Sequence, residues 1–219
     1  MRFINRVDAA RQLAAKLIDL RGDPSVVVLG IPRGGVVVAY EIALALKSPL
    51  DVVLSRKLGA PNNAELAIGA VAENGSRILD DLLIAHLRVP PEYIERVTER
   101  QRLEIERRSA LYRGQRKPID VRERTAVVVD DGVATGATMI VSLRALRESG
   151  VQKLIAAVPV IAPESLSPVQ KLADRVEYVA APGLFVSVGS FYDEFNQVED
   201  EEVRERLSKA NVEGTTGAM

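Results

Sequence analysis

The stretch VVVDDGVATGAT, residues 127–138, ends an apolar run with two adjacent carboxylates and continues into a turn of small residues. The apolar run, residues 126–129, is typical of a buried strand. Because burial of an unpaired charge is costly, we expect Asp130 and Asp131 at the exposed end of that strand. The small residues 132–138 precede a helical pattern, MIVSLRALRESG, and so predict a strand-to-helix turn.

The composition predicts a soluble globular protein, and the length suits one large or two small domains, of which we expect a single domain at residues 1–210. The chain has 219 residues, of which 47% are hydrophobic, enough for a sizeable core. The 29 basic and 30 acidic residues nearly cancel, so no global field favours a nucleic-acid or membrane partner, and any anion site must be local. With no cysteine and one histidine, His86, the chain offers neither disulfides nor a Cys-based zinc site.

The location expected from the sequence is the cytoplasm. The N-terminus lacks the apolar core of a signal peptide, and no segment reaches the roughly 18 apolar residues of a membrane span. The absence of cysteine fits a reducing compartment.

Apolar runs alternate with helical patterns along most of the chain. Six runs predict strands: residues 25–31, 50–55, 67–72, 125–130, 153–160 and 176–180. Helices are predicted at residues 35–46, 137–149 and 164–173, and a first helix capped by Asp8 ends near residue 22. This order predicts an α/β fold with a mostly parallel twisted sheet and helices on both faces. In such sheets, ligands bind beyond the carboxyl ends of the strands.

Three segments depart from this alternation. Residues 80–117 read as a helical insertion whose acids interleave with its bases, which favours a solvated helix with ion pairs over a nucleic-acid role. Residues 182–197 are predicted to form a small hood, and residues 211–219 a flexible tail.

The turn after the acid pair has the features of a phosphate site. At a helix start, several backbone N–H groups lack internal partners and the helix dipole is positive. Gly136 and Ala137 allow close approach, and Thr135 and Thr138 add hydroxyl donors. An ordinary turn with a Thr cap is the alternative. The adjacent carboxylates of Asp130 and Asp131 can accept hydrogen bonds from two vicinal hydroxyls, or bind a divalent cation attached to those hydroxyls. Hydroxyl acceptors a few residues before a phosphate site favour a pentose 5-phosphate as the ligand.

The same stretch resembles the phosphoribosyl pyrophosphate (PRPP) signature of the type I phosphoribosyltransferases, over about a dozen residues. The resemblance implies that Asp130 and Asp131 bind the ribose hydroxyls. It implies a 5-phosphate loop made of Ala134, Thr135, Gly136, Ala137 and Thr138.

Two further stretches are similar to parts of this family. By the same dipole argument, IPRGG is a second anion site, strengthened by the charge of Arg33. It resembles the family's pyrophosphate loop, which here consists of Pro32, Arg33, Gly34 and Gly35. SRKLGAPNNAELAIG, residues 55–69, resembles the region where a basic residue precedes a flexible lid, so Lys57 is the candidate pyrophosphate contact. Arg56 is either part of the same contact or a surface charge.

The segment LFVSVGSFYDEF, residues 184–195, resembles the C-terminal segment of purine-salvage members. By that resemblance Phe185 stacks on the nucleobase, and Asp193 reaches a magnesium ion through water, with Asp130 and Asp131 close to the same metal. The alternative is a hydrophobic plug that packs the end of the sheet.

The resemblance implies an enzyme of nucleotide salvage that transfers the phosphoribosyl group of PRPP to a small nitrogenous base or amine. It further implies Mg²⁺ as cofactor, release of pyrophosphate, and a homodimer. Ala134 stands where members acting on 6-oxopurines carry an acid, which argues against hypoxanthine or guanine as the acceptor. A PRPP-binding regulatory protein without turnover and a phosphosugar hydrolase stay open as alternatives.

Overall fold

A five-stranded parallel sheet forms the centre of the molecule, in a computed structural model that describes residues 1–216. Its order is β2-β1-β6-β7-β8, and every neighbouring pair is parallel. The strands are β1 (Val26–Gly30), β2 (Leu50–Val52), β6 (Thr125–Val129), β7 (Lys153–Val160) and β8 (Arg175–Ala180). The predicted α/β class with a mostly parallel sheet is therefore confirmed.

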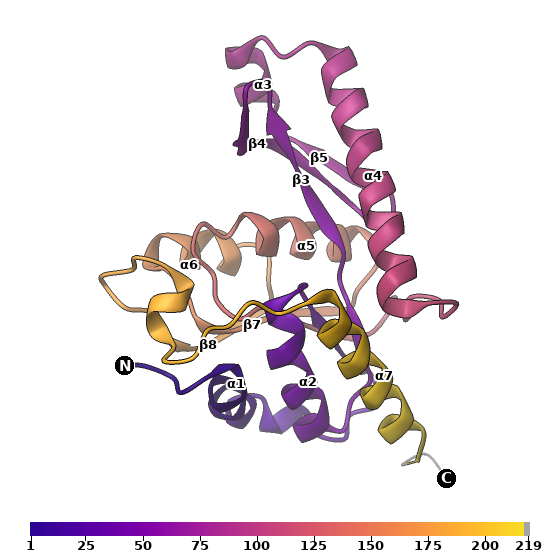
Figure 1. Cartoon of the computed structure of the whole chain (residues 1–219), viewed down its shortest axis with the longest axis vertical. Helices are drawn as coiled ribbons and strands as arrows, with labels where there is room; N and C mark the ends of the chain where they lie inside the picture. Colours follow the sequence, from indigo (N-terminus) through magenta and orange to yellow (C-terminus); the bar gives the residue numbers. More distant parts are fainter. Residues whose placement is uncertain (217–219) are drawn as a thin grey trace.

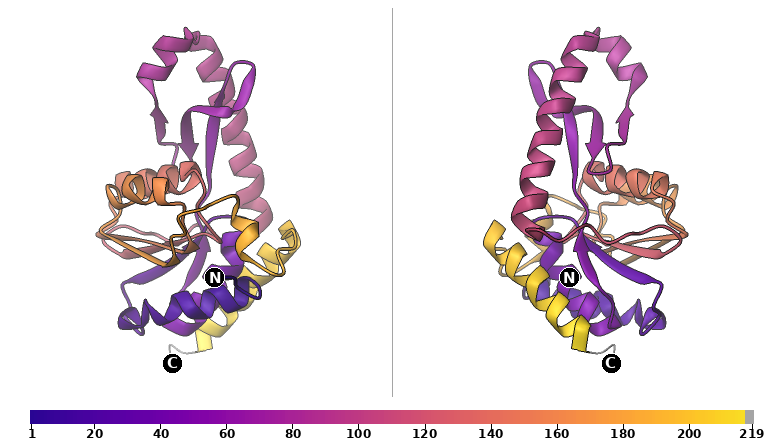
Figure 2. Two further views of the ribbon diagram at one scale, coloured as in Figure 1. Left: turned by 90° about the vertical axis from the view of Figure 1, so that its left-hand side faces the viewer. Right: turned by 90° about the vertical axis from the view of Figure 1, so that its right-hand side faces the viewer.

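Alternate side chains of the strands enter separate hydrophobic cores on the two faces of the sheet. Val26 and Val28 of β1 pack with one group of helices, while Val27 and Leu29 pack with another. The first group consists of α1 (Arg6–Ala15), α2 (Gly34–Leu46) and α7 (Asp200–Thr216), and the second of α5 (Ala137–Glu148) and α6 (Pro163–Gln170). Both layers are visible in Figure 1 and, from the sides, in Figure 2. Strands covered on both faces need apolar residues throughout, which explains the uninterrupted runs in the sequence.

A second unit rises from the sheet as an arm (Figure 1). It combines the antiparallel strands β3 (Ser55–Ala60), β4 (Asn63–Ala72) and β5 (Arg77–Leu79) with helices α3 (Asp81–Leu87) and α4 (Pro91–Arg113). The strand predicted at residues 67–72 exists, but its expected place in the parallel sheet is wrong. Only two residues join β3 to β4, too few for the crossover that parallel pairing requires. The polar stretch predicted as a lid loop is thus a β-hairpin.

The ends of the chain differ from the sequence prediction. Helix α1 begins after Asn5, whose side-chain oxygen accepts hydrogen bonds from the backbone N–H groups of Val7 and Asp8, both at 3.1 Å. Asp8 lies in the first turn, so its predicted role as the cap is wrong. The helix ends at Ala15, and a short 3₁₀ helix, η1 (Ile18–Leu20), follows it. None of the described helices has the length and apolarity needed to cross a bilayer.

The C-terminal segment is helical as far as Thr216. Helix α7 packs against α2 and α4, and it runs through part of the predicted tail to Thr216. Residues 217–219 of that prediction lie outside the described residues. The signal for α7 in the sequence, Val203 and Leu207 facing the core, is weak because these two residues stand among acids and arginines.

Candidate functional site

The two predicted anion loops leave the carboxyl ends of neighbouring strands. In the β1–β6 pairing, Gly30 lies opposite Val129. One residue further, the backbone N–H of Ile31 donates to the carbonyl of Val129 at 2.8 Å. The loop at residues 31–35 therefore runs beside the acid pair, although about a hundred residues separate them in the chain.

The glycines of IPRGG are required by this close approach. A Cβ atom on Gly34 would overlap the carboxylate of Asp131. A Cβ atom on Gly35 would lie 2.7 Å from the carbonyl oxygen of Val129 and 2.8 Å from Cα of Asp130, and neither backbone atom can move aside. The preceding peptide bond, between Pro32 and Arg33, is cis. Two glycines thus let the loop touch the acid pair directly.

The two carboxylates of the pair have different surroundings. Asp130 accepts a hydrogen bond from the backbone N–H of Asp131 at 2.8 Å. Burial and the neighbouring charge of Asp131 raise the pKa of Asp130 well above its usual range. The carboxylate of Asp131 instead accepts a hydrogen bond from Nε of Arg6 at 2.7 Å. The pair is therefore one carboxyl that favours its proton beside one carboxylate held by a cation.

Arg6 also joins the acid pair to the C-terminal segment. Its guanidinium donates to the carbonyl of Asn196 at 2.8 Å and lies 3.9 Å above the centre of the Phe195 ring. The hydroxyl of Tyr192 donates to the carbonyl of Asp131 at 2.5 Å, and its ring stacks on Phe195 with centroids 4.9 Å apart. Neither Arg6 nor Tyr192 carries a local sequence signal for this role, since their partners on the acid pair lie about sixty positions or more away.

The predicted phosphate loop is open at its helix start. Its first residue is anchored, because the N–H of Val133 donates to the carbonyl of Val160 at 2.9 Å. Gly136 has a φ of +75°, which favours glycine, and it caps α5 without a side-chain hydrogen bond. The N–H groups of the first turn therefore lack helical partners. Thr135 and Thr138 are exposed beside them, so this turn can accept an anion.

A cavity of about 260 Å³ brings several predicted residues together. Those that line it are Pro32, Arg56, Lys57, Thr135, Ala137 and Thr138. Two residues of the arm helix α4, Ile105 and Arg108, complete the wall, and the sequence reasoning missed both. Asp130 and Asp131 are not among the lining residues of this cavity.

The remaining predicted residues lie around this region. Arg33 forms an ion pair with Glu199 at 3.3 Å. Phe185 packs against Phe191, with ring centroids 5.1 Å apart, while the adjacent Leu184 is 81% exposed. Asp193 forms an ion pair with Arg2 at 3.1 Å. The structure thus joins Phe185 to a small aromatic cluster and Asp193 to the N-terminal segment, and their roles stay predictions.

The short 3₁₀ helix η2 (Val188–Phe191) anchors the predicted hood next to the acids. Val188 packs so tightly against Gly132 that any side chain at Gly132 would overlap it. Phe3 and Tyr192 form a parallel bridge, and their rings lie 5.3 Å apart. The hood and the N-terminus therefore close one side of the acid pair together.

Among the residues that the structure describes, the candidate site lacks the cluster of side chains that would bind a metal ion without help from a ligand. Within residues 1–216, no group of three or more His, Cys, Asp or Glu side chains is arranged to hold an ion. Magnesium is commonly bound by one or two carboxylates together with substrate phosphates. The acid pair fits a metal that arrives with a phosphorylated ligand.

Comparison with known proteins gives consistent matches. The sequence pattern of the phosphoribosyl transferase domain family matches residues 4–193. A Mycobacterium tuberculosis H37Rv protein, whose name of phosphoribosyl transferase is provisional, is 42% identical over 209 residues, which cover 95% of this chain and 47% of the relative. The chain thus spans about half the length of the curated relatives it matches. The crystal structure of TT1426 from Thermus thermophilus is 42% identical with a TM-score of 0.84, covering 95% of this chain and 99% of that one.

Proposed function

Because the chain belongs to the phosphoribosyl transferase domain family, we propose that it transfers the 5-phosphoribosyl group of PRPP to a nitrogen acceptor. This proposal is supported by the adjacency of the two predicted anion loops and the acid pair at the ends of β1 and β6. Phosphate donors beside hydroxyl acceptors match a ribose 5-phosphate that carries a diphosphate. The proposed acceptor is a small base or amine that needs no acid at Ala134.

In the proposed reaction, the acceptor nitrogen bonds to C1 of the ribose while the bond from C1 to the diphosphate oxygen breaks. The electron pair of that bond leaves on pyrophosphate, and the acceptor loses its proton to solvent. Lys57 and Arg33 would stabilise the growing negative charge, an effect of about 3–4 kcal/mol per preorganised donor. Mg²⁺, when bound together with PRPP, would supply further positive charge to the diphosphate.

The remaining residues would hold the ligand in place. The N–H groups and hydroxyls of residues 134–138 would bind the 5-phosphate, and Asp130 and Asp131 the ribose hydroxyls. Fixing both ends of the ribose lowers the entropic part of the barrier. The predicted cytoplasmic location and homodimer stay predictions alongside this function.

A PRPP-binding regulatory protein without turnover is a second candidate. Two ion pairs favour it: Asp131 with Arg6, and Arg33 with Glu199. Arg6 neutralises the carboxylate of Asp131, and Glu199 neutralises the guanidinium of Arg33. A catalytic site would keep both charges available for the substrate. A ligand that displaces these pairs would change how the N-terminal and C-terminal segments are held.

The test incubates the protein with PRPP, Mg²⁺ and a panel of nucleobases and amines while pyrophosphate is followed. Release that depends on one acceptor supports transfer, whereas release without any acceptor supports a phosphosugar hydrolase. Saturable PRPP binding without release supports the regulatory protein. The double variant Asp130→Asn with Asp131→Asn is the control, and unchanged PRPP affinity in that variant would refute the proposed ribose site.

A further inference from the structure

Helix α4 reaches from the tip of the arm to the candidate site. It spans 23 residues, Pro91–Arg113, and its lower part lies beside β3 (Figure 1). Arg108 and Ile105, in this lower part, line the cavity that also contains Lys57, Thr135 and Thr138. Helix α4, which the sequence predicts to be a solvated insertion, therefore forms part of the wall of this cavity.

The charge in this pocket exceeds what the predicted loops alone provide. Burial lowers the pKa of Arg56, and the positive charge of Arg108 lowers it further. Nε of Arg56 donates at 2.9 Å to the neutral side chain of Gln101 on α4, and the negative charge of Glu104 on the same helix partly offsets the repulsion from Arg108. Two guanidinium groups close enough to repel each other are stabilised when an anion lies between or beside them.

Arg108 shares its carboxylate partner with Arg107. Glu104 accepts from Nε of Arg108 at 2.7 Å and from Nε of Arg107 at 2.8 Å. The two arginines differ in direction, because Arg108 lines the cavity with a side chain 25% exposed, while Arg107 is 56% exposed and does not line it. One carboxylate thus serves two cations, so the positive charge of the two arginines exceeds the negative charge of their shared partner.

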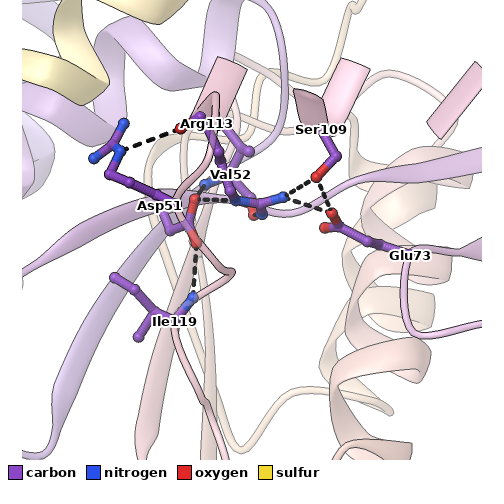
Figure 3. A network of polar contacts seen from close by, with 7 residues as sticks. Asp51, Val52, Glu73, Ser109, Arg113 and Ile119 are labelled. Atoms are coloured by element: carbon purple, nitrogen blue, oxygen red, sulfur yellow. Dashed lines mark hydrogen bonds and ion pairs between the residues drawn. The ribbon is translucent and has the colours of Figure 1, made fainter. Parts of the chain in front are cut away.

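A buried ion-pair network holds the end of α4 in place, five positions beyond Arg108 (Figure 3). The Arg113 side chain, 3% exposed, donates to Asp51 at 2.7 Å and to Glu73 at 2.5 Å. It also donates to the carbonyl of Val52 at 2.8 Å, while Ser109 donates to Glu73 at 2.6 Å. These contacts fix α4 to β2 and to the end of β4. A charged group on a fixed helix is placed more accurately than one on a loop.

We infer that Arg108 is a ligand-binding residue that contacts phosphoryl oxygens in the cavity beside Thr135 and Lys57. The inference rests on the proposed function, since it assigns Arg108 to the site that would bind PRPP. The insertion then has a function of its own, to bring a cation to the phosphorylated ligand. The shared chemistry is a phosphoryl group, either the 5-phosphate of the ribose or the diphosphate.

The test compares Arg108→Ala with Arg107→Ala, a matched control that removes a neighbouring partner of Glu104 outside the cavity. Calorimetry measures the binding of pyrophosphate with Mg²⁺, of ribose 5-phosphate and of PRPP at one ionic strength. We expect Arg108→Ala to weaken PRPP binding about tenfold or more, as expected for the loss of a charge-assisted hydrogen bond. Arg107→Ala should stay within about twofold of the wild type. If Arg108→Ala loses affinity for pyrophosphate, Arg108 contacts the diphosphate; if it loses affinity for ribose 5-phosphate, Arg108 contacts the 5-phosphate.

Arg108→Lys serves as the rescue variant and should recover part of the lost affinity, because it keeps the charge. Thermal melting of each variant checks that α4 remains in place. Equal PRPP affinity in Arg108→Ala and Arg107→Ala overturns the inference alone. Failure of the wild-type protein to bind PRPP and pyrophosphate overturns both the inference and the proposed function.

Discussion

Nε of Arg6 lies 2.7 Å from Oδ2 of Asp131, and both side chains are largely buried, at 11% and 14% exposed. The first helix thereby places a cation on the acid pair that follows β6. The same guanidinium contacts Phe195 and Asn196, so it connects three distant parts of the chain. Arg6 is therefore a positioning residue for Asp131 and for the hood.

Replacement of Arg6 by Ala should destabilise the fold. It leaves the carboxylate of Asp131 without its cation and removes the contacts of Asn196 and Phe195. We expect a loss of about 2 kcal/mol in the free energy of unfolding, below the range for fully buried pairs. Urea denaturation measures it. Arg11→Ala, an exposed arginine on the same helix, is the control. Equal stability of the two variants would show that the ion pair contributes little.

Asp130 should make the stability of the protein depend on pH. Its pKa is raised in the folded state by burial and by the charge of Asp131. The folded state therefore keeps a proton that the unfolded chain loses near pH 4. This contribution is fully present below about pH 4 and is lost as the pH rises toward the folded-state pKa.

The matching variant is Asp130→Asn, which has no carboxyl group to titrate. Relative to the wild type, its free energy of unfolding should increase when the pH is raised from about 5 to about 8. Asp120→Asn is the control, because the hydrogen bond from Arg122 lowers the pKa of exposed Asp120 to about 2. The contribution of Asp120 is present above its unfolded pKa and lost in acid, so this variant should show no trend above about pH 5. If the free energy of unfolding of Asp130→Asn relative to the wild type did not change with pH, Asp130 would not have a raised pKa in the folded state.

Gly34→Ala should impair PRPP binding, because the added methyl group overlaps the carboxylate of Asp131 and displaces it. We expect PRPP affinity to fall by about tenfold or more, comparable to the loss of a charge-assisted hydrogen bond. Gly183→Ala is the matched control, since a Cβ atom there meets no atom within 4 Å. Binding calorimetry with PRPP and Mg²⁺ measures both variants. If Gly34→Ala binds as tightly as Gly183→Ala, Asp131 does not contact the ribose.

Arg113→Met should lower the free energy of unfolding, because it breaks the network that attaches α4 to β2. The substitution keeps an apolar stem of similar length but leaves Asp51 and Glu73 without their cation. Breaking a buried pair in this way typically costs about 3–5 kcal/mol. Thermal or urea unfolding measures the loss, with Arg122→Ala, at an exposed ion pair, as a control that should lose far less stability because exposed ion pairs contribute little. A loss no larger than that of the control would show that the network of Figure 3 does not hold α4.

The elements of the parallel sheet could be predicted from the sequence because their signals are local. Strands buried on both faces read as unbroken apolar runs, and Gly136 marks the turn into α5 through its left-handed backbone. The hairpin of β3 and β4 could not be predicted in the same way, because Gly59, Pro61 and Asn62 resemble a loop when pairing partners are unknown. Helix α7 gives a weak signal since its apolar positions stand among charged residues.

Within the candidate site, short sequence motifs pointed to three features that are each made of consecutive residues. These are the acid pair, the predicted phosphate loop and the glycines of IPRGG. A helix start and a strand end are defined over a few positions, so their anion-binding potential is visible in a short stretch. Arg6, Tyr192 and Arg108 carry no such pattern. An arginine in an amphipathic or charged helix looks the same whether it faces water or a cavity.

The sequence by itself determined the α/β class, the position of the acid pair at a strand end and the presence of two small-residue turns before helices, because each follows from local periodicity and backbone chemistry. Only the tertiary structure decided that IPRGG touches the acid pair, that Arg6 neutralises Asp131 and that α4 brings Arg108 to the cavity. Those relationships join residues far apart in the chain. They arise from strand order and helix packing, which the free energy of the whole fold selects rather than any single segment.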